Sequence, residues 1–333
     1  MNTNTGDFPM MRTTDLLRAT TLLLTLGAVA IAAPKKGAKD ADFAIQGEYT
    51  GTLKGDEGDF KLGVQVIALG GGKFRGVGHP GGLPGDGFDK SKDKEQVEAE
   101  KNDDGSVTFK GEHGSGTVKD GVMKIVDNDG NHIGDLKRVI RKSSTLGKKP
   151  PQGATVLFDG KNADNFKPGK ITKDGLLEQG ANSKQRFGSH TLHIEFRLPY
   201  QPKARGQGRG NSGCYLQGRY EVQMLDSFGL AGKHNECGGI YTIKEPSVNM
   251  CYPPMSWQTY DIEFTEAVFK DGKKVKDARI TVLHNGVKIH DNVALTHRTT
   301  GSPLAEGSGP GFLHLQNHGN PVRYRNIWVV EKK

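Results

Sequence analysis

The chain lacks most of the features that mark a metal site or a nucleic-acid interface. It has only three cysteines in 333 residues, and no two have the CxxC spacing of a zinc site. Lysine and arginine outnumber aspartate and glutamate by 46 to 38, but they are scattered, without a basic stripe or an interleaved aromatic ladder. We therefore expect no nucleic-acid partner, although a basic surface could retain acidic polysaccharide.

Long apolar runs are equally scarce. The strongest run, from Leu22 to Ala33, is too short for a comfortable membrane span. Arg12 and Arg18 precede it, and Ala30-Ile31-Ala32 supplies the small residues that a signal peptidase needs. Residues 1–33 are therefore interpreted as a signal peptide. We expect an exported, periplasmic or extracellular protein with no stable membrane span, and the sequence leaves its oligomeric state open.

Helical periodicity is also missing, because no stretch longer than about ten residues keeps a helical pattern of apolar side chains. Short alternating runs recur instead, separated by turns rich in the 47 glycines. Asn285-Gly286 predicts a two-residue hairpin turn. The predicted fold class is all-β. A spacer (34–42) leads to a small Gly-rich β module of unknown role (43–142), then a Pro-Pro and lysine linker (143–153), then a β-sandwich (154–333).

The cysteines fit an exported chain, in which one disulfide and one free thiol are expected. Cys237 and Cys251 flank a compact loop and are the predicted pair. Cys214 lies at an apolar position of a predicted strand and is expected to be packed in the core. The alternative, in which Cys237 and Cys251 are free buried thiols, remains open at this point.

Two stretches with β-type alternation contain most of the candidate functional residues. In Asn211–Asp226, one parity is apolar and the other is polar: Tyr215, Gln217, Arg219, Glu221 and Gln223. In Phe312–Trp328, Leu313 and Leu315 alternate with His314, Gln316 and His318. Successive side chains of a strand point to opposite faces, so each stretch would bury one row and present the other. Such a polar, aromatic row suits a sugar; the alternative is an ordinary solvated face.

A third row holds further titratable groups, because His193, Glu195 and Arg197 alternate with apolar residues. If these strands share one concave sheet, we expect a single groove, with Asp226 near a strand end. The groove would hold Glu195, Glu221, Gln223, Gln316 and His318. Acid–base chemistry on a sugar needs two titratable groups whose pKa values differ. The alternative for Glu195 is a carboxylate paired with Arg197 or Arg325.

Several motifs occur in a fixed order between Ala154 and Val330. They are Val156-Leu157-Phe158-Asp159-Gly160, Glu195-Phe196-Arg197, Asn211-Ser212-Gly213, Tyr220-Glu221-Val222-Gln223, Gly238-Gly239-Ile240-Tyr241, Trp257-Gln258-Thr259-Tyr260-Asp261, Leu315-Gln316-Asn317-His318-Gly319-Asn320-Pro321-Val322 and Arg325-Asn326-Ile327-Trp328. Together they resemble the 3-keto-disaccharide hydrolase family, a concanavalin- or laminin-G-like jelly-roll domain of exported bacterial proteins. The chain departs from the family at Phe166, where tryptophan is usual, and at Asn317, where aspartate often precedes His-Gly.

The resemblance implies cleavage of 3-keto-glycosides or 3-keto-disaccharides, by hydrolysis or by elimination followed by hydration. It implies Glu221 or His318 as the base and Glu195 as an acid or metal ligand. Substrate contacts are expected from Asn211, Tyr215, Gln217, Gln223, Asp226, Gln316 and Arg325. No cofactor is required by any spacing motif, although such residue types could hold a divalent metal ion. The alternative is a lectin-like module that binds carbohydrate without turnover.

Overall fold

The computed structural model describes residues 40–88 and 92–332, so the predicted signal peptide lies outside the described residues. Residues from Asp40 onward form one compact unit. Apart from a helical turn, α1 (Asp42–Ile45), and a short 3-10 turn, η1 (Gly206–Gly208), its regular elements are strands. The predicted all-β class is therefore confirmed. In the described part of the chain, no helix has the length and apolar character to cross a membrane.

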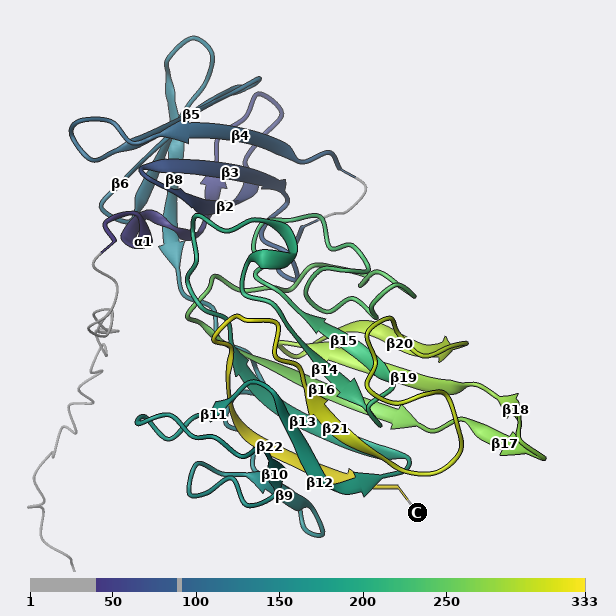
Figure 1. The fold of residues 1–333 in the computed structure, drawn as a ribbon. Helices are drawn as coiled ribbons and strands as arrows, with labels where there is room; N and C mark the ends of the chain where they lie inside the picture. Colours follow the sequence, from purple (N-terminus) through teal and green to yellow (C-terminus); the bar gives the residue numbers. More distant parts are fainter. Residues whose placement is uncertain (1–39, 89–91, 333) are drawn as a thin grey trace, which may run out of the picture. The chain divides into compact units, whose positions relative to one another are not determined.

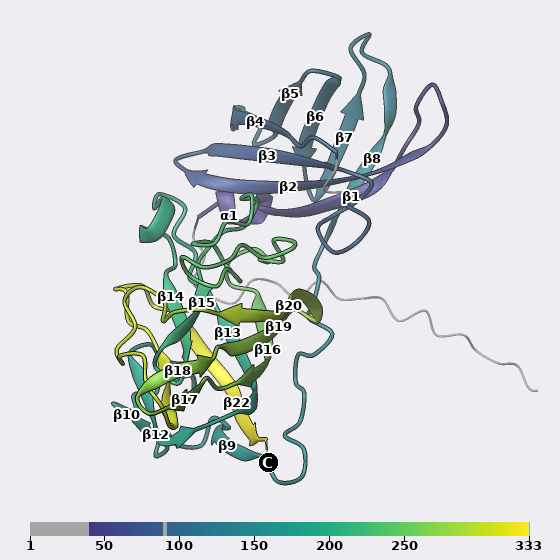
Figure 2. The same ribbon diagram turned by 90° about the vertical axis from the view of Figure 1, so that its right-hand side faces the viewer.

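The first body is an eight-stranded antiparallel sheet in the order β4-β3-β2-β1-β8-β7-β6-β5 (Figures 1 and 2). Its strands are β1 (Gly47–Leu53), β2 (Phe60–Gly70), β3 (Lys73–Pro80), β4 (Glu95–Glu100), β5 (Val107–Gly111), β6 (Gly114–Lys119), β7 (Val122–Val126) and β8 (His132–Val139). Lys101, after β4, forms a bridge with Val107 at the start of β5, so the two edge strands meet. The sheet thus curls into an up-and-down barrel, and we call it the barrel from here on.

The second body is a sandwich of two sheets (Figure 1). The five-stranded sheet has the order β10 (Phe166–Lys167), β12 (Ala181–Phe187), β21 (Gly311–Leu315), β14 (Ser212–Leu216), β15 (Tyr220–Met224). The seven-stranded sheet has the order β11 (Leu177–Glu178), β22 (Arg323–Glu331), β13 (His190–Arg197), β16 (Trp257–Thr265), β19 (Ala278–His284), β20 (Val287–Leu295), with β9 (Thr155–Phe158) also paired to β22. A separate hairpin joins β17 (Val268–Lys270) and β18 (Lys273–Lys276).

The predicted alternation explains the core of the sandwich. Leu192, Ile194 and Phe196 of β13 are fully buried, as are Leu216 of β14 and Val222 of β15. These rows fill the space between the two sheets, so the residues between them must face outward. The outer rows of both sheets therefore hold the titratable side chains.

The Asn285-Gly286 turn joins β19 to β20 as predicted. Both residues have positive φ, 53° for Asn285 and 84° for Gly286. This combination belongs to the type I′ turn, which matches the twist of the strands that it connects.

The segment predicted as a linker packs along the outer face of the seven-stranded sheet. The Ser143 hydroxyl lies 2.6 Å from the Thr259 hydroxyl, and Lys148 Nζ lies 3.0 Å from Asp261 Oδ1. The backbone N–H of Gly147 donates to Glu195 Oε1 at 2.6 Å. We call residues 143–149 the strap. One of its partners, Glu195, belongs to the polar row identified in the sequence.

The predicted disulfide is absent, because all three cysteines are free and buried. The thiols of Cys237 and Cys251 are hydrogen-bond neighbours, so the two residues do lie together, but without a bond between the sulfurs. Burial raises the pKa of Cys251 well above its usual range. A thiol without accessible thiolate is a poor nucleophile for oxidation, and the pair fills core space as small apolar side chains do.

Candidate functional site

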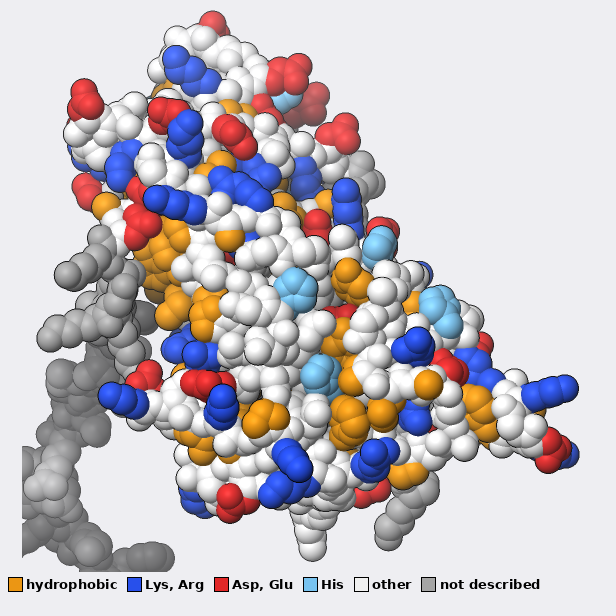
Figure 3. Space-filling view, viewed as in Figure 1, with side chains coloured by type: hydrophobic (Ala, Val, Ile, Leu, Met, Phe, Trp, Pro, Cys, Tyr) orange, Lys and Arg blue, Asp and Glu red, His pale blue; other side chains and the backbone are white. Residues whose placement is uncertain are grey.

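The outer face of the five-stranded sheet brings together three candidate functional side chains from neighbouring strands. Tyr215 of β14 is the register partner of Glu221 on β15 and also of His314 on β21. Directly opposed side chains on one face lie about 5 Å apart at Cβ. The Tyr215 and His314 rings have centroids 5.2 Å apart. The strand register therefore assembles the site, and in Figure 3 the surface over these strands is largely uncharged and shows histidine side chains.

Glu221 is the central titratable group of this face, and its side chain is 2% exposed. A Cβ atom added to Gly213, on the neighbouring strand, would lie 2.0 Å from Glu221 Oε1, so only glycine leaves room for the carboxyl group. Burial raises the pKa of Glu221 to about 8, although a hydrogen bond from the Tyr215 hydroxyl acts in the opposite direction. Glu221 can therefore take up and release a proton near neutral pH.

A short relay of donors leads to Glu221. Gln316 Nε2 donates to the Tyr215 hydroxyl oxygen at 3.1 Å, and that hydroxyl in turn is hydrogen-bonded to Glu221. Burial raises the pKa of Tyr215, and the Glu221 charge raises it further, so Tyr215 remains a donor throughout the physiological pH range. The relay holds the carboxyl group in one orientation.

His314 is the third member of the site and is neutral. Burial lowers its pKa to about 4. Its Nδ1 is hydrogen-bonded to Asn182 Oδ1 on β12, so Nδ1 carries the hydrogen and Nε2 has the lone pair. A neutral imidazole of this kind accepts a hydrogen bond from a sugar hydroxyl without adding charge.

An amide cluster continues the same row. Asn211 Nδ2 and Gln223 Nε2 both donate to Gln207 Oε1, at 3.1 Å and 3.0 Å. Within the described residues, the carbonyl oxygens Asn211 Oδ1 and Gln223 Oε1 are buried and have no hydrogen-bond partner. A buried acceptor without a donor is costly. The cluster is therefore suited to accept hydrogen bonds from a hydroxylated ligand.

Glu195 and Arg325 lie elsewhere, on the outer face of the seven-stranded sheet. Arg325 Nε is 2.6 Å from Glu195 Oε2, and Asn326 and the strap also donate to this carboxylate. Although burial acts in the opposite direction, hydrogen bonds from His193 and these groups lower the pKa of Glu195 to about 2. The expectation of one shared groove is thus wrong for Glu195, because β13 and β15 belong to different sheets.

Three other candidate residues do not join the Glu221 face. Gln217 has a φ of 53° in the β14–β15 turn, where its Nε2 donates to the Phe187 carbonyl at 3.1 Å. Asp226 is buried in an ion pair with Arg209 at 2.6 Å. His318, in the loop after β21, is exposed and makes no hydrogen bond or ion pair with a described residue.

The described residues offer no set of donor side chains for the divalent metal ion that the sequence left open. Across residues 40–88 and 92–332, no group of three or more His, Cys, Asp or Glu side chains is placed to hold a metal ion. The residues around Glu221 are amides, a phenol and a neutral imidazole, and Glu221 is the only carboxylate on the five strands of its sheet. This donor set does not fit a divalent ion.

Sequence reasoning missed the roles of His314, Asn182 and Gln207. His314 was placed in a polar row by the sequence but was given no role, although it shares the parity of Gln316, the residue that follows β21. Asn182 gives no such signal, since its partner strand is more than 100 residues away in the chain. Gln207 lies in η1, an irregular segment whose placement follows from tertiary packing.

The fold is a two-sheet β-sandwich, and the outer face of its five-stranded sheet holds one buried titratable carboxyl group. The model of the 3-keto-alpha-glucoside-1,2-lyase-like domain matches residues 153–330, more than half of the chain, so the chain belongs to this family. A solved structure from Parabacteroides distasonis ATCC 8503, provisionally named a glycosyl hydrolase, is 32% identical to the chain. The match covers 55% of this chain and 85% of that one, with a TM-score of 0.51.

Two more structures from the same organism have the same provisional name. They are 20% and 17% identical, with TM-scores of 0.38 and 0.40, and both matches cover 54% of this chain. They span 99% and 95% of those proteins, respectively. No curated protein sequence matches the chain.

Proposed function

We propose that the sandwich cleaves 3-keto glycosides on the outer face of β14, β15 and β21, with Glu221 as the base. The observation that carries the proposal is the state of Glu221. It is buried, it is hydrogen-bonded to Tyr215, and its pKa is raised to about 8. A carboxylate held in this way is a stronger base than an exposed one, and a general base works best when its pKa lies near the operating pH.

The chemistry needs only one carboxylate if the substrate already has a ketone at carbon 3. The ketone acidifies the neighbouring C2–H bond. Glu221 takes the C2 proton, the C–H electron pair moves into the enolate, and the C1–O bond then breaks with its electron pair going to the departing oxygen. That oxygen takes up the proton that Glu221 gained, which restores the ionised carboxylate. Water adds across the resulting double bond, with hydroxyl at carbon 1 and a proton at carbon 2. The net result is hydrolysis.

Tyr215 is placed to act in the same sequence. When Glu221 is ionised, the Tyr215 hydroxyl donates to it. Once Glu221 has taken the proton, that hydrogen bond weakens, and the hydroxyl becomes free to donate to an oxygen that gains negative charge. The unpartnered oxygens of Asn211 and Gln223 would accept from sugar hydroxyls and orient the ring.

Ordinary glycoside hydrolysis is less compatible with this face. The two usual mechanisms use a pair of carboxyl groups, about 5 Å or about 6.5–9.5 Å apart. The five strands of this sheet contain Glu221 and no second carboxylate. Elimination from a ketone needs no such pair, so the 3-keto class is the better fit.

The test compares 3-keto disaccharides with the same disaccharides before oxidation, with and without a chelator. We expect turnover of the keto forms alone and no effect of the chelator. In D₂O, the released sugar should contain deuterium at carbon 2, because elimination exchanges that hydrogen. Glu221→Gln should remove turnover by at least about 100-fold, the scale of general-base catalysis, and leave binding measurable.

Glu195→Gln is the matched control, since its carboxyl group lies on the other sheet; it should keep turnover. Equal loss in both variants would contradict the assignment of Glu221. Binding of disaccharides without turnover of either form would instead support the lectin-like alternative.

We also propose that the chain is exported, on the strength of the apolar segment from Leu22 to Ala33 and the small residues at Ala30-Ile31-Ala32. The mass of the protein recovered from the periplasm or medium should correspond to cleavage at this site. Recovery of the uncleaved chain from the cytoplasm would contradict export.

A further inference from the structure

We propose that one end of the barrel binds a small amphiphile with an apolar tail and a cationic head. This end has a cavity of about 750 Å³, within the range of small-molecule sites. All eight strands, or the turns next to them, contribute to its lining. Barrels of eight strands are either filled by their own side chains or wide enough to hold one small ligand.

The barrel is filled at one end only. Tyr49, Val66 and Phe74 are fully buried and belong to one packed cluster. The cavity lies at the other end, where β1, β5 and β7 finish and β2, β4, β6 and β8 begin. Leu53 and Phe109 mark the boundary between the two halves, since both belong to the packed cluster and also line the cavity.

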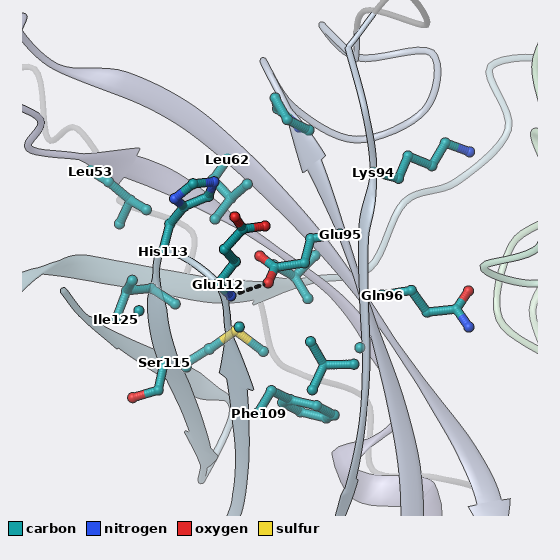
Figure 4. A pocket seen from close by; sticks show the side chains of 18 of the residues that line it. Leu53, Leu62, Lys94, Glu95, Gln96, Phe109, Glu112, His113, Ser115 and Ile125 are labelled. Carbon is teal, nitrogen blue, oxygen red and sulfur yellow. Dashed lines mark hydrogen bonds between the residues drawn. The ribbon is translucent and has the colours of Figure 1, made fainter. Parts of the chain in front are cut away.

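The cavity wall is apolar and partly exposed to solvent. Phe60 is 44% exposed, and Val97 is half-buried. Leu62 and Ile125 are half-buried as well (Figure 4). Apolar surface of this kind gains free energy when an apolar group replaces water. The wall therefore favours a hydrocarbon tail over a sugar ring.

The mouth of the cavity is acidic. Asp93, Glu95 and Glu112 lie there against a single lysine, Lys94. The backbone N–H of Glu112 donates to Glu95 Oε1 at 2.5 Å, which fixes one carboxylate over the opening (Figure 4). A cationic head group would complement this rim, and a carboxylate head would be repelled. The chain as a whole has a formal charge of +8, so nonspecific attraction would favour anions instead.

The experiment uses the full chain and the uncharged fluorescent dye N-phenylnaphthylamine as a reporter of the cavity. Dodecyltrimethylammonium and dodecanoate, which have tails of similar length and opposite charge, are titrated as competitors at low ionic strength, below their micelle-forming concentrations. We expect the cation to displace the dye at a concentration at least about tenfold lower than the anion. Equal or better displacement by dodecanoate, or no dye binding, would overturn the proposal.

Two matched pairs of variants locate the site. Ile125→Trp places a large ring in the cavity, whereas Lys124→Trp places it on the outer face of the same strand. Dye affinity should fall at least about tenfold in the first and stay unchanged in the second. Val97→Phe replaces Ile125→Trp if that variant does not fold. Unchanged affinity in a folded cavity variant would refute the site.

Glu95→Gln tests the acidic rim, because glutamine can still accept the hydrogen bond from Glu112. It should reduce the preference for the cation over the anion by at least about threefold, since one of three rim carboxylates is lost. The control is Asp271→Asn, in the turn between β17 and β18, where the positive φ of 50° suits asparagine. An equal change in both variants would show a general charge effect and contradict the rim assignment.

Discussion

At the residue scale, the candidate site depends on the surroundings of the Glu221 carboxyl group, which set its pKa. Gly213 makes room for Glu221, Tyr215 donates to it, and burial weakens its acidity. An exposed glutamate would be ionised at neutral pH but would be a weak base. The buried Glu221 is ionised in a smaller fraction of the molecules at neutral pH, but its carboxylate is a stronger base.

The raised pKa of Glu221 predicts how the catalytic rate depends on pH. Only ionised Glu221 can take the substrate proton, and its pKa is about 8. We therefore expect kcat/KM for a 3-keto substrate to rise about tenfold per pH unit below pH 8 and to level off above it. The measurement is a pH–rate profile of the free enzyme, with circular dichroism at each pH. A profile that is flat from pH 6 to 9 would show that Glu221 is not the base.

The three cysteines give a second prediction at this scale. The structure has them as free buried thiols, and burial raises the pKa of Cys251 so that little thiolate is available for oxidation. Titration of the denatured, unreduced protein should give three thiols. A result of one thiol would restore the Cys237–Cys251 bridge that the loop spacing suggested.

Parity along a strand identified some residues that the structure brings together in the candidate site. Tyr215, Glu221 and Gln316 were identified because they alternate with buried neighbours, and the structure places all three on one face. Parity was not sufficient for Glu195. It tells which face of its own strand a residue occupies, but not which of the two sheets that strand joins. That choice depends on long-range pairing.

At the scale of elements, the strap is the clearest case of a segment that the sequence described only in part. Pro-Pro and lysines predicted a linker between two domains. They gave no sign that Ser143, Gly147 and Lys148 would bond to the outer row of the seven-stranded sheet. The turn at Asn285-Gly286 was predictable, because its signal is local.

The strap contacts give a third prediction, on acid stability. Glu195 has a side chain that is 1% exposed and a folded-state pKa of about 2, against an ordinary value of 4.5. A lowered carboxyl pKa stabilises the fold above the unfolded value, and this stabilisation disappears as the pH falls toward the folded value. We expect Glu195 to account for a loss of roughly 3 kcal/mol between pH 4.5 and pH 2.

Thermal unfolding of the wild type and of Glu195→Gln should show this contribution. The variant should be less stable at pH 6, and the difference should shrink below pH 4.5. Glu263→Gln, which changes an exposed carboxylate on β16, is the control and should follow the wild type. A difference that stays constant with pH would contradict the lowered pKa of Glu195.

At the scale of the whole molecule, the barrel and the sandwich are both built from antiparallel strand pairs, but their interiors are filled differently. The barrel leaves one end unfilled, whereas the sandwich fills its core and places the titratable groups on its outer faces. Composition and turn signals predicted two β regions. Strand order was not predictable, since β9 pairs with β22 at the far end of the chain.

The last prediction concerns where the sandwich begins as a folding unit. The sequence places its boundary at residue 154, but the strap before it covers Glu195, Thr259 and Asp261. A fragment of residues 142–333 keeps these contacts, and one of residues 154–333 loses one strap hydrogen bond at each of these three buried polar groups. At about 1 kcal/mol for each lost hydrogen bond, the shorter fragment should unfold roughly 6–12 °C lower. Differential scanning calorimetry of both fragments measures this difference. Equal Tm values would show that the strap adds nothing to the stability of the sandwich, and a longer fragment without cooperative unfolding would show that the sandwich needs the barrel to fold.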